Sequence, residues 1–157
     1  MGLERLNEGD YNAAFAYFTR AGSLGNVEAH YQLSTLYYTE MYDEEVGVDT
    51  DEKKALHHLT EAAIGGHPIA RHNLGCFEWK DGRMDRAAKH FIIAAKLGFD
   101  LSLKCIKDFY KAGHVSKEDF AAALRGHKAA VDATKSPQRE EAAAYKKWAA
   151  ERKRRGV

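Results

Sequence analysis

Residues that break helices or cross-link chains are scarce in this sequence of 157 residues, which contains two prolines and two cysteines. No Asn-Gly or Asp-Gly turn separates two alternating β-branched segments, so the sequence gives little indication of β-strands. The two cysteines, Cys76 and Cys105, lie far apart, which favours two free thiols in a reducing compartment over one disulfide. Because alanine is abundant and proline is rare, we expect an all-α fold.

Neither a strong excess of one charge nor a long apolar segment is present. The formal net charge is +1, so no global electrostatic field attracts nucleic acid or membrane. No apolar segment reaches the length of about 18 residues that a membrane-spanning helix requires. The N-terminal segment MGLERLNEGDY lacks the apolar core of a signal peptide. We therefore expect a cytoplasmic protein, with a nuclear location as the alternative.

Residue patterns that would indicate catalysis or metal binding are also missing, although the sequence contains eight histidines. His57 and His58 are adjacent, and neighbouring side chains on a helix point about 100° apart. No His-x-x-x-His pair with a nearby carboxylate is present. We expect His67, which lies in a Gly-His-Pro turn, to hold that turn, and we expect both cysteines to lie in or near the core. We predict no catalytic residue, no metal, no cofactor and no enzymatic activity.

An internal repeat is the strongest positive feature of the sequence. A small residue is followed by an apolar residue after four positions, a glycine after 11, a small residue after 15, and apolar residues after 19 and 22. The three sets are Ala14, Phe18, Gly25, Ala29, Leu33 and Leu36; Ala55, Leu59, Gly66, Ala70, Leu74 and Phe77; and Ala87, Phe91, Gly98, Ser102, Ile106 and Phe109. Steps of three and four place residues on one face of a helix, and glycine is typical of helix ends. Each set predicts two helices joined by a tight turn, with the apolar members and the alanines forming the core.

Three segments, AHYQLSTLYY, VGVDTDEKKALHHLTEAAIGGHPIARHNLG and DRAAKHFIIAAKLG, resemble Sel-1-like repeats, which are relatives of tetratricopeptide repeats. The residues that match the pattern are Val48, Asp51, Lys54, Ala55, Ala62, Ala63, Gly66, Ala70, Leu74 and Gly75. The resemblance covers roughly residues 10–112 and departs from the pattern at Ser34, where the family usually has glycine. It implies a right-handed α-solenoid that acts as an adaptor or scaffold in protein complexes, without catalytic activity.

Two regions follow from this pattern. We expect residues 1–135 to form the helical repeat array, with about three repeats of which the first is incomplete, and residues 136–157 to form a basic C-terminal helix. Ser136 as N-cap and Pro137 at the first helical position predict where that helix begins. Tyr145, Trp148 and Ala149 form a narrow apolar stripe, which predicts that the helix docks on the array as a cap. A helix that projects freely is the alternative.

The beginning of the array predicts a truncated first helix, because only eight residues precede Gly9. The following helix carries Phe15, Tyr17 and Phe18 over a wide arc, whereas a terminal repeat normally needs a polar outer face. We therefore expect either self-association through the N-terminal end or a chain that is a fragment of a longer array.

The function that these patterns predict is a non-enzymatic adaptor, which binds a partner protein or peptide on the concave face of the array. We expect the first helix of each pair to line that face. The predicted contact residues are His30, Gln32, Thr35, Tyr38, Arg71, Asn73 and Trp79. This interpretation includes neither a membrane nor nucleic acid among the partners. The alternative is a nucleic-acid-associated or nuclear protein that uses the basic C-terminal segment KKWAAERKRR.

Overall fold

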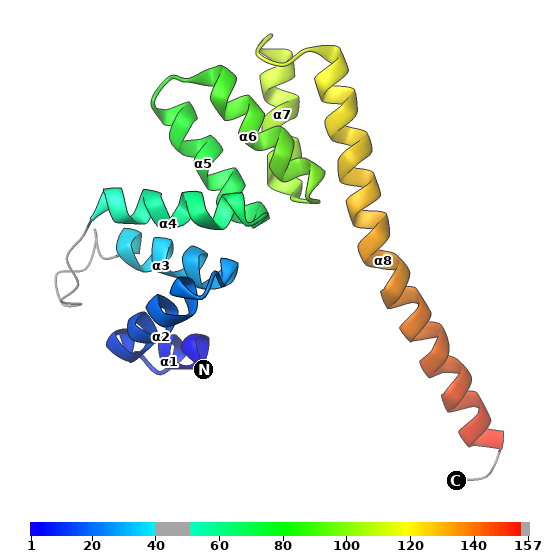
Figure 1. The fold of residues 1–157 in the computed structure, drawn as a ribbon. Helices are drawn as coiled ribbons and strands as arrows, with labels where there is room; N and C mark the ends of the chain where they lie inside the picture. The colour runs from blue at the N-terminus through cyan, green and yellow to red at the C-terminus, as the bar shows by residue number, and fades with distance from the viewer. Residues whose placement is uncertain (40–50, 155–157) are drawn as a thin grey trace.

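The regular elements of the protein are helices throughout residues 1–39 and 51–154, which the computed structural model describes (Figure 1). They are α1 (Gly2–Asn7), α2 (Tyr11–Ser23), α3 (Val27–Thr39), α4 (Glu52–Ile64), α5 (Pro68–Lys80), α6 (Met84–Lys96), α7 (Asp100–Lys111) and α8 (Lys117–Arg154). The prediction of an all-α fold is therefore confirmed. Val48, one of the residues that carried the family resemblance, lies outside the described residues.

Tight turns with a left-handed glycine end six of these helices. The glycine lies two residues after the last helical residue in each case, and the six are Gly9, Gly25, Gly66, Gly82, Gly98 and Gly113. In the turn after α4, the amide of His67 donates to the carbonyl of Ala62 at 3.0 Å, which satisfies one free carbonyl of the helix end. Only glycine adopts this backbone conformation without strain. The predicted helix ends at Gly25, Gly66 and Gly98 are therefore confirmed.

Neighbouring helices run antiparallel and pack in pairs, and the pairs stack into a curved α-solenoid (Figure 1). The pairs are α1 with α2, α3 with α4, α5 with α6, and α7 with the N-terminal part of α8. Each pair also contacts the next, because α2 packs against α3, α4 against α5, and α6 against α7. No helix can bury its apolar face alone, so the stack itself forms the core.

The core follows the repeat closely. Thirteen of the predicted core residues are buried, which are Ala14, Phe18, Ala29, Leu33, Leu36, Ala55, Leu59, Ala70, Leu74, Ala87, Phe91, Ile106 and Phe109. The prediction was wrong for Phe77, which is half-buried and packs against the edge of the cluster that contains Leu59. Phe77 lies at the border between the core and the surface of the array.

A glycine sets the contact between α5 and α6. A Cβ atom on Gly75 would lie 2.7 Å from the ring of Phe91, which is too close for a real contact. Phe91 is fully buried, and its ring meets that of Phe109 edge-on with centroids 5.4 Å apart. Gly75 therefore allows one aromatic ring to lock α5, α6 and α7 together.

The C-terminal helix begins earlier than predicted. Ser116 caps it, because its Oγ atom accepts from the amide of Asp119 at 3.0 Å. From there α8 continues without a break to Arg154, so the predicted helix start at Ser136 and Pro137 is wrong. Proline removes one helical hydrogen bond, but the alanine-rich segments on either side favour helix strongly enough to continue it. The division at residue 135 therefore does not coincide with a helix boundary.

Residues 132–154 of α8, which we call the free half of α8, project away from the array (Figure 1). Tyr145 is 67% exposed and Trp148 is 51% exposed, so the predicted docking of this helix as a cap is wrong. Only the N-terminal part packs on α6 and α7, where Ala123 is fully buried and Ala130 approaches Gly98. The narrow stripe of two aromatic residues therefore remains exposed on the projecting part of the helix.

The first helix of the array is a short segment, as predicted. α1 has six residues, and its Gly2 is buried against the rings of Tyr17 and Phe18. Leu3 is 51% exposed and Tyr17 is 44% exposed, so apolar surface remains open at this end. Self-association through this end stays a prediction.

Candidate functional site

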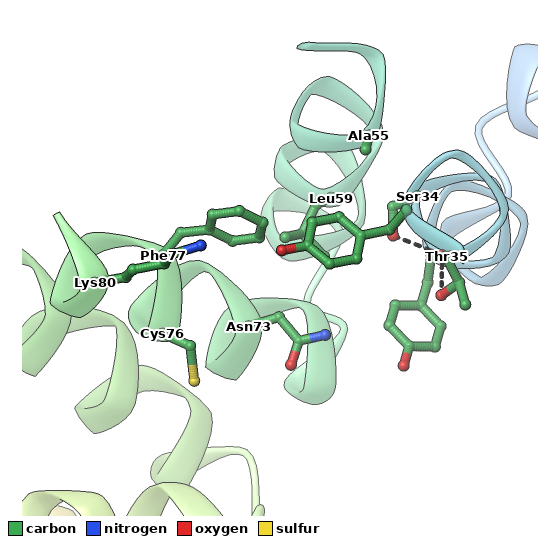
Figure 2. A pocket seen from close by; sticks show the side chains of 10 residues that line it. Ser34, Thr35, Ala55, Leu59, Asn73, Cys76, Phe77 and Lys80 are labelled. Carbon is green, nitrogen blue, oxygen red and sulfur yellow. Dashed lines mark hydrogen bonds between the residues drawn. The ribbon is translucent and has the colours of Figure 1, made fainter. Parts of the chain in front are cut away.

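A groove of about 350 Å³ opens between α3, α4 and α5 (Figure 2). We call it the α3–α5 groove. Its lining residues are Tyr31, Ser34, Thr35 and Tyr38 from α3, Ala55 and Leu59 from α4, and Asn73, Cys76, Phe77 and Lys80 from α5. α3 and α5 are the first helices of successive pairs, which are the helices that the sequence predicts to line the face for partner binding.

The floor of the groove is apolar and one wall is aromatic. Ala55 and Leu59 of α4 are buried beneath it, and the small side chain of Ala55 leaves space between the two flanking helices. The ring of Tyr38 meets the ring of Phe77 edge-on, with centroids 5.6 Å apart. A groove of this kind can take an apolar side chain of a ligand.

Two polar side chains at the groove are available to a ligand. Within the part of the chain that the structure describes, neither the Asn73 amide nor the Lys80 ammonium group has a hydrogen bond or an ion pair. By contrast, the hydroxyl groups of Ser34 and Thr35 donate to the backbone carbonyl of Tyr31, at 2.7 and 3.1 Å. Asn73 can both donate and accept, and Lys80 can pair with a carboxylate.

Cys76 lines the groove but is not arranged as a nucleophile. Its Sγ atom lies 3.5 Å from Nε2 of His72, whose Nδ1 lies 2.8 Å from the hydroxyl of Ser102. Burial raises the pKa of the Cys76 thiol, and nearby Cys105 raises it further. The thiol is therefore protonated at neutral pH, whereas a reactive cysteine needs a thiolate. We predicted that Cys76 lies in or near the core, whereas the structure places it exposed at the groove.

The contact between His72 and Ser102 joins successive repeats. Ser102 is fully buried in α7, and His72 belongs to α5. Burial lowers the pKa of His72, so the imidazole is neutral and can bond to the buried hydroxyl without bringing a charge into the core. This contact positions α5, which carries one wall of the groove.

Three of the predicted contact residues lie in the groove, namely Thr35, Tyr38 and Asn73. The other four lie outside it. Gln32 donates to Oε1 of Glu28 at 2.7 Å on the surface of α3. Trp79 is 49% exposed and packs edge-on against Phe109 of α7 with ring centroids 5.6 Å apart.

His30 and Arg71 hold helices together, and neither lines the groove. Nδ1 of His30 lies 3.0 Å from Nδ1 of His58, which joins α3 to α4. Arg71 donates from Nη2 to the carbonyl of Ala63 at 2.7 Å, which joins α5 to the end of α4. Both residues flank the core stripe as predicted, but they contact a neighbouring helix.

Sequence reasoning missed four of the groove residues that contact solvent, which are Tyr31, Cys76, Phe77 and Lys80. The helical spacing contained the signal. Tyr31 precedes Thr35 by four residues, and Phe77 and Lys80 follow Asn73 by four and seven. Starting from Thr35 and Asn73, steps of three and four would have found the same face.

The prediction that His67 holds its turn is confirmed. His67 is the N-cap of α5, where Nδ1 accepts from the amide of Ala70 at 3.2 Å. That bond leaves the proton on Nε2, which lies 3.1 Å from Oε2 of Glu28 on α3. The ring also stacks on Tyr31 with centroids 4.3 Å apart. His67 therefore fixes α5 against α3 at one end of the groove.

Neither a metal site nor a membrane span is found in residues 1–39 and 51–154. No three His, Cys, Asp or Glu side chains among them are placed to hold a metal ion. None of the helices in these residues combines the length and the apolar composition that crossing a bilayer requires.

The fold resembles one that has been solved. The crystal structure of c5321, described as a protective antigen present in uropathogenic Escherichia coli strains displaying an SLR fold, superposes with a TM-score of 0.60. The two sequences are 21% identical, and the match covers 79% of this chain and 28% of that chain. At this identity the likeness concerns the fold alone. The matched part spans less than a third of the length of that chain.

Sequence comparison identifies the repeats directly. No curated protein matches the chain. The model of the Sel1 repeat matches three consecutive segments, residues 2–26, 27–67 and 68–99. These segments contain α1 with α2, α3 with α4, and α5 with α6, so each matched segment is one of the stacked helix pairs. Because the matches cover more than half of the sequence, the chain belongs to the Sel1 repeat family.

Proposed function

We propose that this protein is a non-enzymatic interaction module, which binds a segment of a partner protein in the α3–α5 groove. The observation that carries the proposal is an apolar floor bordered by two polar side chains, Asn73 and Lys80, that have no partner within the described residues. Membership of a family of helical repeats supports an adaptor role.

The chemistry of the groove suggests which segment it binds. Its volume of about 350 Å³ lies at the small end of ligand sites, so it has space for one or two side chains. An aliphatic or aromatic side chain would lie on the apolar floor formed by Ala55 and Leu59, beside the Tyr38 and Phe77 rings. The Asn73 amide would bond to the backbone of the bound segment, and Lys80 would pair with an acidic residue beside it.

Selection of binding peptides tests this function and does not require the natural partner. A random peptide library displayed on phage is panned against the full chain, and the affinity of each recovered peptide is measured by fluorescence anisotropy. We expect recovered peptides to combine an apolar residue with a nearby Asp or Glu. Asn73→Ala and Lys80→Glu should each weaken binding about 10-fold or more, as expected for loss of a bond to a charged or desolvated group.

The matched control is Lys89→Glu, because Lys89 is an exposed lysine on α6 outside the groove. It makes the same charge change and should leave peptide affinity unchanged. If all three variants bind the selected peptides as the unmodified chain does, the groove is not the binding site.

Alkylation of Cys76 gives a second readout at the same place. In a Cys105→Ser background, Cys76 is the remaining thiol, and it lines the groove. A bound peptide should slow its reaction with iodoacetamide. An unchanged alkylation rate with saturating peptide would contradict binding in the groove.

A further inference from the structure

Four side chains form one stripe along the free half of α8. Glu141, Tyr145, Trp148 and Arg152 follow one another at steps of four, three and four residues, which places them on the same face of a helix. All four are exposed. The stripe is the face of this helix on which the aromatic side chains lie.

The partners of these side chains within the described residues are few. The rings of Tyr145 and Trp148 lie 5.6 Å apart, and the guanidinium group of Arg152 lies 5.3 Å from the centre of the Trp148 ring. No hydrogen bond or ion pair of Glu141 is found in the described part of the chain. Two large aromatic side chains on a projecting helix form an apolar surface that no other helix within residues 1–39 and 51–154 covers (Figure 1).

The stripe is complementary to itself when it is reversed. Its order is acidic, aromatic, aromatic, basic, and the outer residues are equally distant from the midpoint between the two aromatic residues. An antiparallel copy of the helix therefore places Tyr145 opposite Trp148 of the second copy. The same register places Glu141 opposite Arg152 at both ends. A parallel copy would place Glu141 against Glu141 and Arg152 against Arg152, which like-charge repulsion disfavours.

We propose that the free half of α8 pairs with the free half of α8 of a second copy, in an antiparallel arrangement about a twofold axis. The interface is isologous, since the same stripe serves on both copies. Each aromatic side chain buries roughly 150–250 Å², so four of them bury less than the ~1,200 Å² at the low end of stable interfaces. The dimer is therefore weak and concentration-dependent. This pairing does not depend on the proposed function of the α3–α5 groove.

Sedimentation equilibrium of the full chain over a concentration series tests the proposal. We expect a reversible monomer–dimer equilibrium, and we expect Trp148→Ala to weaken it at least ~10-fold, because truncating a central aromatic anchor is costly. Glu141→Arg and Arg152→Glu should each weaken it as well, since each creates two like-charge contacts across the twofold axis. The combined Glu141→Arg, Arg152→Glu variant restores both opposite-charge contacts, so its dimer should be nearly as strong as that of the unmodified chain.

Lys147→Glu is the matched control, since Lys147 is exposed on a different face of the same helix and should not alter dimerisation. Circular dichroism of each variant verifies that helix content is unchanged. These variants change only exposed residues, so the array remains folded.

Three results would overturn the proposal. A chain that stays monomeric throughout the series would show that the stripe does not bind a second copy, even if Trp148 proves necessary for binding vesicles of anionic lipid or duplex DNA. A dimer that Trp148→Ala leaves intact would place the interface elsewhere, for example at the N-terminal end. A combined charge variant as weak as the single ones would exclude the antiparallel register.

Discussion

The α5–α6 pair and the free half of α8 both carry large aromatic side chains, yet the two regions differ completely in how they use them. Phe91 of α6 is fully buried, whereas Trp148 of α8 is 51% exposed. Both helices have favourable sequences for helix formation, so local propensity does not explain the difference. What differs is the presence of a neighbouring helix that covers the aromatic face.

A turn at a glycine places a neighbouring helix against α6, whereas no such turn places a helix against the free half of α8. Gly82 has a φ of 77° and reverses the chain after α5, which brings α6 back against it. Gly126 lies inside α8, where the helix passes through it. Gly126 does not have a positive φ, so no turn follows it and the chain is not reversed there. The comparison shows that burial in a solenoid is decided by the turns at least as much as by the apolar stripe.

The largest expected effect is a difference in stability between a variant of the α5–α6 pair and a variant of the free half of α8. Phe91→Ala should lower the free energy of unfolding by about 3–5 kcal/mol, the usual cost of deleting a buried phenylalanine side chain. Trp148→Ala should change it by less than about 0.5 kcal/mol, as expected for an exposed position. Urea unfolding followed by circular dichroism measures both, at a protein concentration low enough to keep the chain monomeric. Equal losses for the two variants would mean that Trp148 contributes to the fold within one chain.

A smaller effect compares two helical glycines. Gly75→Ala should destabilise the protein by about 1–3 kcal/mol, because the added Cβ atom would collide with the ring of buried Phe91. Gly126→Ala places its Cβ 2.7 Å from Cγ of Lys96, so this exposed side chain must change its conformation, whereas the ring of Phe91 is fixed in the core. Alanine also favours helix over glycine by about 1 kcal/mol. We therefore expect Gly126→Ala to lose less stability than Gly75→Ala, and unfolding midpoints measure the contrast.

A loss of stability in Gly126→Ala as large as that in Gly75→Ala would contradict this difference. It would mean that α8 lies as tightly against α6 as α5 does. The Gly75→Ala, Phe91→Leu double variant sharpens the test. A smaller side chain should relieve part of the collision, so the double variant should lose less stability than the sum of the two single variants.

The repeat could be predicted from the sequence because one physical cause produces both its glycines and its apolar positions. A left-handed glycine ends each helix, and the apolar positions around it must meet when the chain reverses. Ala14, Ala55 and Ala87 therefore predicted the core without a structure. Phe77 was the exception, because residues at the edge of the core and residues in the wall of the groove have the same helical spacing.

The candidate site was predicted less well, because it depends on the rotation of each helix by a few tens of degrees. Thr35 and Asn73 were placed correctly, but His30 and Arg71 contact neighbouring helices. The sequence does not show which polar residues beside the core stripe face the groove and which face a neighbouring helix. The continuation of α8 through Pro137 was equally hidden, since capping residues can also occur within a helix when no turn precedes them.

The smallest expected effect is a pH dependence that is confined to the array. Burial lowers the pKa of His58, His72 and His90, and the free half of α8 contains no histidine. The unfolded chain binds a proton at each of these histidines with a pKa near 6.5, whereas the folded chain does so only at lower pH. Their contribution to stability is therefore complete above about pH 6.5 and is lost as the pH falls below it. Each contribution should be smaller than the effect of Gly75→Ala, because these side chains are only partly buried.

Several groups around His58 affect how much stability is lost when the pH falls. His30 of α3 lies against it with the two Nδ1 atoms 3.0 Å apart, His57 is its neighbour on α4, and Glu61 is the nearby acidic group. The ring of Tyr37 stacks on its face. Protonation of His58 would bring a positive charge into its half-buried contact with His30, so acid should weaken the packing of α3 against α4. The urea midpoint of unfolding should be lower at pH 5.5 than at pH 7.5. The difference between the two midpoints should be smaller in His58→Gln than in the unmodified chain. His57→Gln is the control, because the His57 side chain is exposed. A fall that is the same in the unmodified chain, in His58→Gln and in His57→Gln would show that this pair does not control the response to acid.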